Sequence, residues 1–316
     1  VAGQSDKIVV FAGLPDVFES ESYDRDHMCL PNCQNQLIEK LTKLGKPVIV
    51  VLHNGSPVEM PWVDNVQGIV EAYLGGEAVA EAVMDILYGE ANPSGRLAET
   101  FPRRLEDNPS YLNFPGMQKQ VNYAEGIFVG YRYYDARKMD VLFPFGYGLS
   151  YTEFEQKMGE LEEKDGQISV DVEVTNTGDV AGKDVVEVYY EPPYTNGGIE
   201  KSSANLIEFA KTDLLQPGES QTVTVTFSIE DMASYDENHA KAYVLEKGDY
   251  AISINSDSHT VLDQKTYTAD KDVVYKGENK RASDDTAATN VFEDAKGDVT
   301  YLSRADHFAN YEEATA

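Results

Sequence analysis

A loop rich in ionisable side chains follows the first apolar run of the chain. It extends from Pro15 to Pro31, directly after the apolar residues at positions 8–14. Its ionisable residues are Asp16, Glu19, Glu21, Asp24, Arg25, Asp26 and His27. A loop that leaves a buried strand and carries carboxyl groups beside an arginine can hold a general acid. A solvated loop of an acidic protein can have the same composition, so both interpretations are open on these residues alone.

Other catalytic and cofactor motifs do not occur in the sequence. It contains no glycine-rich dinucleotide fingerprint, no phosphate-binding P-loop and no G-x-S-x-G nucleophile elbow. The five histidines have no spacing typical of metal ligands. Cys29 and Cys33 lack a second pair that would complete a zinc site, and we expect both to be free thiols. The sequence therefore predicts neither a metal nor a cofactor.

Alternating strand and helix patterns predict an α/β arrangement over the first 150 residues. Short apolar runs typical of buried strands occupy Lys7–Pro15, Pro47–Leu52 and Gly68–Tyr73. Helical spacing of apolar residues occurs in Gln34–Leu44 and Glu77–Leu87. This alternation is typical of a parallel or mixed sheet with helices on its faces. Ligand sites on such sheets lie beyond the carboxyl ends of strands, where the ionisable loop is predicted.

The pattern changes after Tyr151. Apolar and polar residues alternate in Ile168–Val174, Val185–Tyr190, Thr222–Phe227 and Tyr250–Ile254. Such strands, separated by turn residues, predict an antiparallel β-sandwich of roughly 100 residues. From about residue 269 the sequence is polar and weakly patterned, so we expect a linker or an arm.

Length and charge narrow the class of protein. The 316 residues suffice for two or three domains. With 55 acidic against 26 basic residues, the net charge of −29 excludes a general nucleic-acid binder and argues against attachment to an anionic membrane. No apolar run approaches the roughly 20 residues that span a bilayer. A hydrophobic fraction of 41% is too high for a disordered chain.

The first predicted strand begins only a few residues after Val1. We therefore expect earlier elements of the same sheet to precede it. No signal peptide is readable, and localisation, either cytoplasmic or secreted from a microbe, stays open.

A series of motifs resembles those of glycoside hydrolase family 3 β-glucosidases. The segment ESESYDR at 19–25, followed by Leu30-Pro31 and Gln34, resembles the E-G-Y-D-R…L-P…Q segment of that family. Further similar segments, in family order, are GSPV (55–58), PW (61–62), YLGGE (73–77), NPSGRL (92–97), TFP (100–102), EGIFVGYRYYD (125–135) and FPFGYGLSY (143–151). The resemblance covers about residues 7–265.

The resemblance implies a fold of the α/β plus all-β class. Residues 1–150 would form the second half of an α/β-sandwich domain. Residues 151–268 would form a fibronectin type III-like antiparallel β-sandwich. Residues 269–316 would be a linker or arm toward a barrel domain, because the family's (β/α)8 barrel has no counterpart in this sequence.

The resemblance also implies site residues. Glu21 matches the general acid/base of the family's retaining mechanism, with Glu19 as the runner-up. Asp24 and Arg25 are candidates for bracing the loop by ion pairing, and the substrate-binding residues are not assigned. The family's usual glycine after the acid/base is replaced by Ser22. The nucleophile would lie in the barrel, outside this chain, so we expect the chain alone to be inactive.

The implied function is that of a segment of an exo-β-glucosidase. It would hydrolyse terminal non-reducing β-D-glucosyl residues of a β-glucoside or cello-oligosaccharide, in assembly with the barrel segment and without a cofactor. A related β-xylosidase or N-acetylhexosaminidase is one alternative. A non-catalytic carbohydrate-binding or scaffold fragment is another, and a homo-oligomer is also left open.

Overall fold

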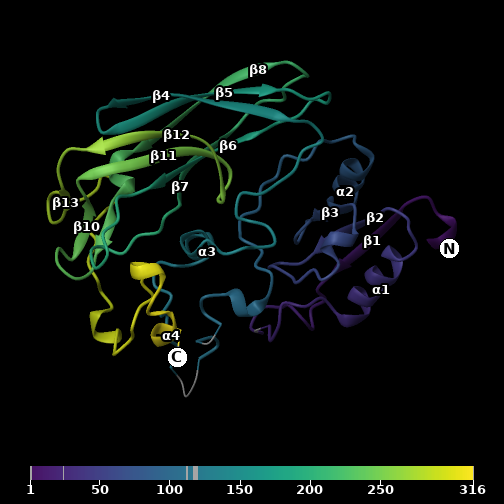
Figure 1. Cartoon of the computed structure of the whole chain (residues 1–316), viewed down its shortest axis with the longest axis horizontal. Helices are drawn as coiled ribbons and strands as arrows, with labels where there is room; N and C mark the ends of the chain where they lie inside the picture. Colours follow the sequence, from purple (N-terminus) through teal and green to yellow (C-terminus); the bar gives the residue numbers. More distant parts are fainter. Residues whose placement is uncertain (1, 24, 112, 117–119, 316) are drawn as a thin grey trace. The chain divides into compact units, whose positions relative to one another are not determined.

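The computed structural model describes residues 2–23, 25–111, 113–116 and 120–315 (Figure 1). The chain forms two compact units. The first contains residues 1–91 and 101–108, and the second contains residues 92–100 and 109–316.

The first unit is built on a three-stranded parallel sheet in the order β1-β2-β3. Its elements are β1 (Ile8–Gly13), α1 (Asn32–Thr42), β2 (Val48–His53), β3 (Gly68–Glu71), α2 (Val79–Tyr88) and short 3-10 turns at Ala2–Gln4, Val63–Asn65 and Leu105–Asp107. Each predicted strand and helix is present with its ends shifted by a few residues. The α/β class predicted for this region is therefore confirmed.

The outer strand β1 differs from the expected pattern of a buried strand. Ile8, Val10 and Ala12 are buried, whereas Val9 and Phe11 on the other face are 41% and 57% exposed. Side chains alternate between the two faces of a strand, so only Ile8, Val10 and Ala12 point to the buried face of the sheet. The central strand β2, with a neighbour on each side, is the more deeply buried of the two.

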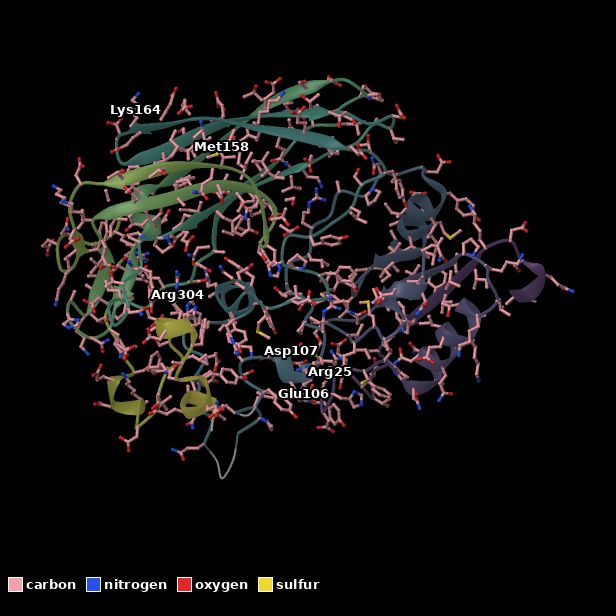
Figure 2. The ribbon with its side chains drawn as sticks, in the orientation of Figure 1. Arg25, Glu106, Asp107, Met158, Lys164 and Arg304 are labelled. Carbon is pink, nitrogen blue, oxygen red and sulfur yellow. The ribbon has the colours of Figure 1, made fainter. Side chains whose placement is uncertain are left out.

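The second unit is dominated by an antiparallel β-sandwich, as the sequence predicts. One sheet has the order β4-β5-β8, with β4 (Phe154–Lys164), β5 (Gln167–Asn176) and β8 (Ser220–Ser228). The other has the order β12-β11-β6-β7, with β12 (Thr260–Ala269), β11 (Gly248–Asp257), β6 (Val185–Glu191) and β7 (Asn205–Lys211). The inward residues of both sheets form one apolar core, which includes Met158 of β4 (Figure 2).

Smaller elements complete the second unit. A third sheet has the order β13-β10-β9. Its strands and the remaining helices are β9 (Ser234–Asp236), β10 (Ala242–Leu245), β13 (Val273–Tyr275), α3 (Tyr131–Arg137), α4 (Tyr311–Thr315) and 3-10 turns at Ile229–Met232, Glu293–Ala295 and Ala305–His307. Among the described residues, no helix is long and apolar enough to cross a bilayer.

The segment after residue 269 folds onto the second unit. Phe308 of this segment, which is yellow in Figure 1, lies in an apolar cluster with Phe128 and with Tyr133 of α3. The guanidinium of Arg137 lies 4.4 Å from the centre of the Tyr311 ring. The segment is thus an ordered arm within this unit, and its interpretation as an approach to a barrel stays a prediction.

A buried carboxyl group lies beneath the sandwich surface on β6. Glu187 is only 4% exposed, and its Oε2 accepts a hydrogen bond of 2.8 Å from the Tyr189 hydroxyl. Burial, together with the nearby charges of Asp257 and Asp184, raises the pKa of Glu187 to about 7, although the Tyr189 hydrogen bond and the charge of Arg96 act in the opposite direction. The folded chain therefore binds this proton at a higher pH than the unfolded chain does.

We expect Glu187 to make the chain less stable as the pH rises from about 4.5 to about 7, because the unfolded carboxyl loses its proton first. Glu187→Gln lacks this titrating group. Its free energy of unfolding, measured relative to that of wild type, should therefore rise by on the order of 3 kcal/mol from pH 4.5 to pH 8. Urea unfolding followed by circular dichroism at several pH values measures this. Exposed Glu162→Gln on β4 is the control, and equal pH slopes for Glu187→Gln and wild type would contradict the prediction.

Candidate functional site

The candidate site lies at the carboxyl ends of β1 and β2. The ionisable loop leaves β1 at Gly13, and the turn after β2 begins at His53. The amide of Leu14 donates to the His53 carbonyl at 3.0 Å, so the two connections start side by side. A Cβ atom at Gly13 would lie 2.1 Å from that carbonyl oxygen, so only glycine permits this approach. The side-chain amide of Gln34 on α1 exchanges two hydrogen bonds of 2.9 Å with Gly13.

Glu19 fastens the ionisable loop to the turn after β2. Its Oε2 accepts a hydrogen bond of 2.6 Å from the Gly55 amide, and its Oε1 accepts one of 2.7 Å from Ser56 Oγ. Arg25 donates from Nη1 to Ser56 Oγ at 2.6 Å and to the Pro57 carbonyl at 3.2 Å. The same nitrogen lies 3.7 Å from Glu19 Oε1. We call this set of Glu19, Arg25, Gly55 and Ser56 the loop clamp.

Glu21 occupies the tip of a tight turn within the same loop. The Tyr23 amide donates to the Ser20 carbonyl at 3.3 Å, which places Glu21 and Ser22 at the two central positions. Ser22 has φ of +62°, the left-handed value that a type II turn requires at its second central position. Glu21 is exposed, and within the described parts of the chain its carboxylate has no hydrogen-bond or ion-pair partner. The two glutamates of the segment therefore have different environments.

The other ionisable residues of the loop that the structure describes do not join the clamp. Asp16 and Asp26 are exposed. The ring centroid of His27 lies 5.9 Å from that of Phe18, and His27 Nδ1 accepts a hydrogen bond from the Cys29 amide. Asp24, a candidate for bracing the loop, lies outside the described residues. Arg25, labelled in Figure 2, makes the contacts described above, and its bracing role stays a prediction.

Sequence reasoning missed the partners of the loop. It named residues 55–58 only as a segment that resembles the family, although Gly55 and Ser56 bind Glu19 in the loop clamp. Behind this turn, the fully buried Asn54 donates to the Ser56 carbonyl at 3.0 Å and to Glu71 Oε2 at 3.3 Å. The usable signal was topological, because loops after neighbouring parallel strands emerge at the same edge of the sheet.

Both cysteines are free thiols, as the sequence predicts. Cys29 Sγ lies 3.6 Å from Glu59 Oε2, and burial, followed by the negative charge of Glu59, raises the pKa of the Cys29 thiol. Glu59 Oε1 also accepts a hydrogen bond from the Leu105 amide at 3.3 Å. In the ranges that the structure describes, no group of three metal-ligating side chains is placed to hold an ion.

Comparisons with known proteins agree with the order of domains. Residues 1–151 match the model of the glycosyl hydrolase family 3 C-terminal domain, and residues 184–258 match that of the fibronectin type III-like domain. The chain belongs to glycoside hydrolase family 3. The left-handed φ of Ser22 gives a physical reason for the glycine that is usual at this position in the family.

The family's β-glucosidases include close relatives of the chain. The chain is 48% identical over 265 residues to thermostable beta-glucosidase B of Acetivibrio thermocellus. This match covers 83% of the chain and 35% of that protein. The crystal structure of a β-glucosidase from Kluyveromyces marxianus in complex with glucose matches with a TM-score of 0.83 at 37% identity, covering 87% of this chain and 33% of that one. The GH3 β-glucosidase of Bifidobacterium adolescentis matches with a TM-score of 0.81 at 35% identity, covering 85% of this chain and 40% of that one. The chain therefore spans roughly a third of the length of these relatives.

We expect Ser22→Gly to relieve backbone strain in the turn that carries Glu21, because serine disfavours the φ of +62° found there. The free energy of unfolding should rise by up to about 1 kcal/mol, since the greater freedom of glycine in the unfolded chain offsets part of the relief. Urea unfolding followed by the fluorescence of Trp62 measures this change in the first unit. Ser20→Gly is the matched control, because Ser20 does not have a positive φ and should gain nothing. A gain for Ser20→Gly and a loss for Ser22→Gly would contradict the assignment of strain.

Proposed function

We propose that the chain is a segment of a retaining exo-β-glucosidase and supplies its general acid/base, Glu21. The observation that carries the assignment is the difference between the two glutamates of the loop. Both carboxylate oxygens of Glu19 accept hydrogen bonds within the loop clamp, whereas the carboxylate of Glu21 is exposed at the tip of a turn. A general acid must reach the glycosidic oxygen of a substrate, and only the second arrangement leaves a carboxyl group free to do so.

In this mechanism two carboxyl groups act on one sugar. A nucleophilic carboxylate attacks the anomeric carbon while the Glu21 carboxyl donates its proton to the departing glycosidic oxygen. A water molecule then attacks the anomeric carbon of the glycosyl-enzyme, and Glu21 takes the proton from that water. The bond to the nucleophile breaks, and both carboxyl groups return to their starting states.

The nucleophile is proposed to come from a barrel-domain segment of the same enzyme. The relatives are about three times as long as the part that this chain matches, which leaves room for such a segment. In this scheme residues 1–150 form the second half of the α/β-sandwich domain, residues 151–268 the fibronectin type III-like domain, and residues 269–316 the arm toward the barrel. Arg25 braces the loop through the clamp, and the same role is proposed for Asp24.

The proposed substrates are terminal β-D-glucosyl residues of a β-glucoside or cello-oligosaccharide. The names of the relatives support glucose over the xylose or N-acetylhexosamine that other members of the family would accept. The exposed carboxylate of Glu21 supports a catalytic segment over a purely structural one.

We expect Glu21→Ala in the assembled enzyme to slow hydrolysis in proportion to the basicity of the leaving group. Protonation by a positioned acid contributes typically 10²–10⁴-fold, so a disaccharide should lose about that factor. An aryl glucoside with a stable phenolate should lose little in the glycosylation step. Azide should restore deglycosylation, because it attacks without a general base. Steady-state and burst kinetics on both substrates, with and without azide, measure these effects.

Two controls accompany this experiment. Asp16→Ala, which removes another exposed carboxyl group of the same loop, should leave both substrates at wild-type rates. The 316-residue chain by itself should not hydrolyse either substrate, because it supplies one of the two carboxyl groups. Uniform losses on both substrates, without azide rescue, would place the acid elsewhere.

A further inference from the structure

The loop clamp holds both ends of the turn that carries Glu21. Glu19 directly precedes the turn that begins at Ser20, and Arg25 follows shortly after its last residue, Tyr23. Both side chains meet at one atom, because Ser56 Oγ donates to Glu19 and accepts from Arg25. The turn is therefore fixed at its base from both directions while its tip stays exposed.

In the loop clamp the charge of Glu19 is compensated, and the space around its carboxyl group is limited. The Glu19 carboxylate has a neutral donor on each oxygen and the Arg25 guanidinium nearby, so its charge is compensated. Glu19 is 20% exposed and Arg25 is 16% exposed at their side chains, so the ion pair is only partly screened by water. A Cβ atom at Gly55 would lie 3.2 Å from the Glu19 carboxyl group, so the turn after β2 leaves little room for movement there.

We propose that Glu19 is a positioning residue that fixes the Glu21 carboxyl group for proton transfer, with Ser56 and Arg25 as its partners. This inference rests on the proposed role of Glu21. Its physical basis is that proton transfer requires the acid within hydrogen-bond reach of the leaving oxygen, so a displacement of about 1 Å can cost about 10²-fold in rate. Glu19 touches neither substrate nor reacting atoms in this scheme.

The kinetic test compares Glu19→Ala with Glu21→Ala in the assembled enzyme. Glu19→Ala should lower kcat on a disaccharide by about 10- to 100-fold, with KM within about 3-fold of wild type. The loss on an activated aryl glucoside should be smaller, and azide should have little effect because the Glu21 carboxylate is still present. Glu19→Gln should recover part of the rate, since its amide oxygen can accept from Gly55 or Ser56.

A double-mutant cycle isolates the clamp. If Glu19 acts through Ser56, the Glu19→Ala/Ser56→Ala double variant should be no more than about 3-fold slower than Glu19→Ala alone. Multiplied losses would mean that the two residues act independently and would overturn the proposal. Equal losses in kcat on both substrates would also overturn it, because they would indicate a smaller fraction of folded enzyme.

A second measurement separates this inference from the proposed function. In the 316-residue chain alone, Glu19→Ala should accelerate amide hydrogen exchange over residues 18–25 by at least about 10-fold, whereas Asp16→Ala should not. Unchanged exchange would overturn the clamp whatever Glu21 does. If Glu21→Ala behaves as proposed and Glu19→Ala stays within about 3-fold of wild type, positioning fails while the acid/base assignment stands. If azide rescues Glu19→Ala and Glu21→Ala hydrolyses both substrates at wild-type rates, Glu19 is itself the acid and both proposals fail.

Discussion

The carboxylate of Glu19 joins two connections that the sheet brings to the same edge. The loop after β1 and the turn after β2 are more than thirty residues apart in sequence. The Gly55 amide and the Ser56 hydroxyl connect them by donating hydrogen bonds to Glu19. Hydrogen bonds to a charged group contribute roughly 1.5–3 kcal/mol each when they are shielded, and less where water reaches them. The proposed catalytic geometry depends on this attachment, because the turn that carries Glu21 has no regular secondary structure of its own.

The parallel sheet makes this attachment possible. The register of β1 on β2 pairs Gly13 with His53, so the chain leaves both strands at the same level. Gly13 permits the close approach of the two backbones, and Gln34 on α1 fixes Gly13 through both of its peptide groups. Asn54 and Glu71 hold the turn after β2 from behind.

Much of this architecture could be predicted from the sequence. The buried runs and helical spacings of the first unit, and the period-two strands of the sandwich, follow directly from side-chain patterning. The exposed face of β1 could not, because the apolar residues on both faces of this strand predict burial on both sides. The positive φ of Ser22 was also hidden, since serine gives no signal for it and only the family's glycine hinted at special geometry. The clamp required knowledge of which loops meet, and that depends on strand order and register. From the composition of the loop, Glu19 and Glu21 are nearly equal candidates for the general acid. Their three-dimensional contacts distinguish them, because Glu19 is hydrogen-bonded and Glu21 is exposed.

In the proposed enzyme, Glu21 faces a second carboxyl group across the substrate while Glu19 stays bonded to the turn after β2. A crystal structure of the assembled enzyme with glucose bound tests it most directly. We expect the Glu21 carboxyl group to lie about 5–5.5 Å from the nucleophilic carboxylate, as in retaining glycosidases, with Glu19 still bonded to Gly55 and Ser56. A structure in which Glu19 faces the sugar, or in which Glu21 points to solvent away from it, would contradict the account.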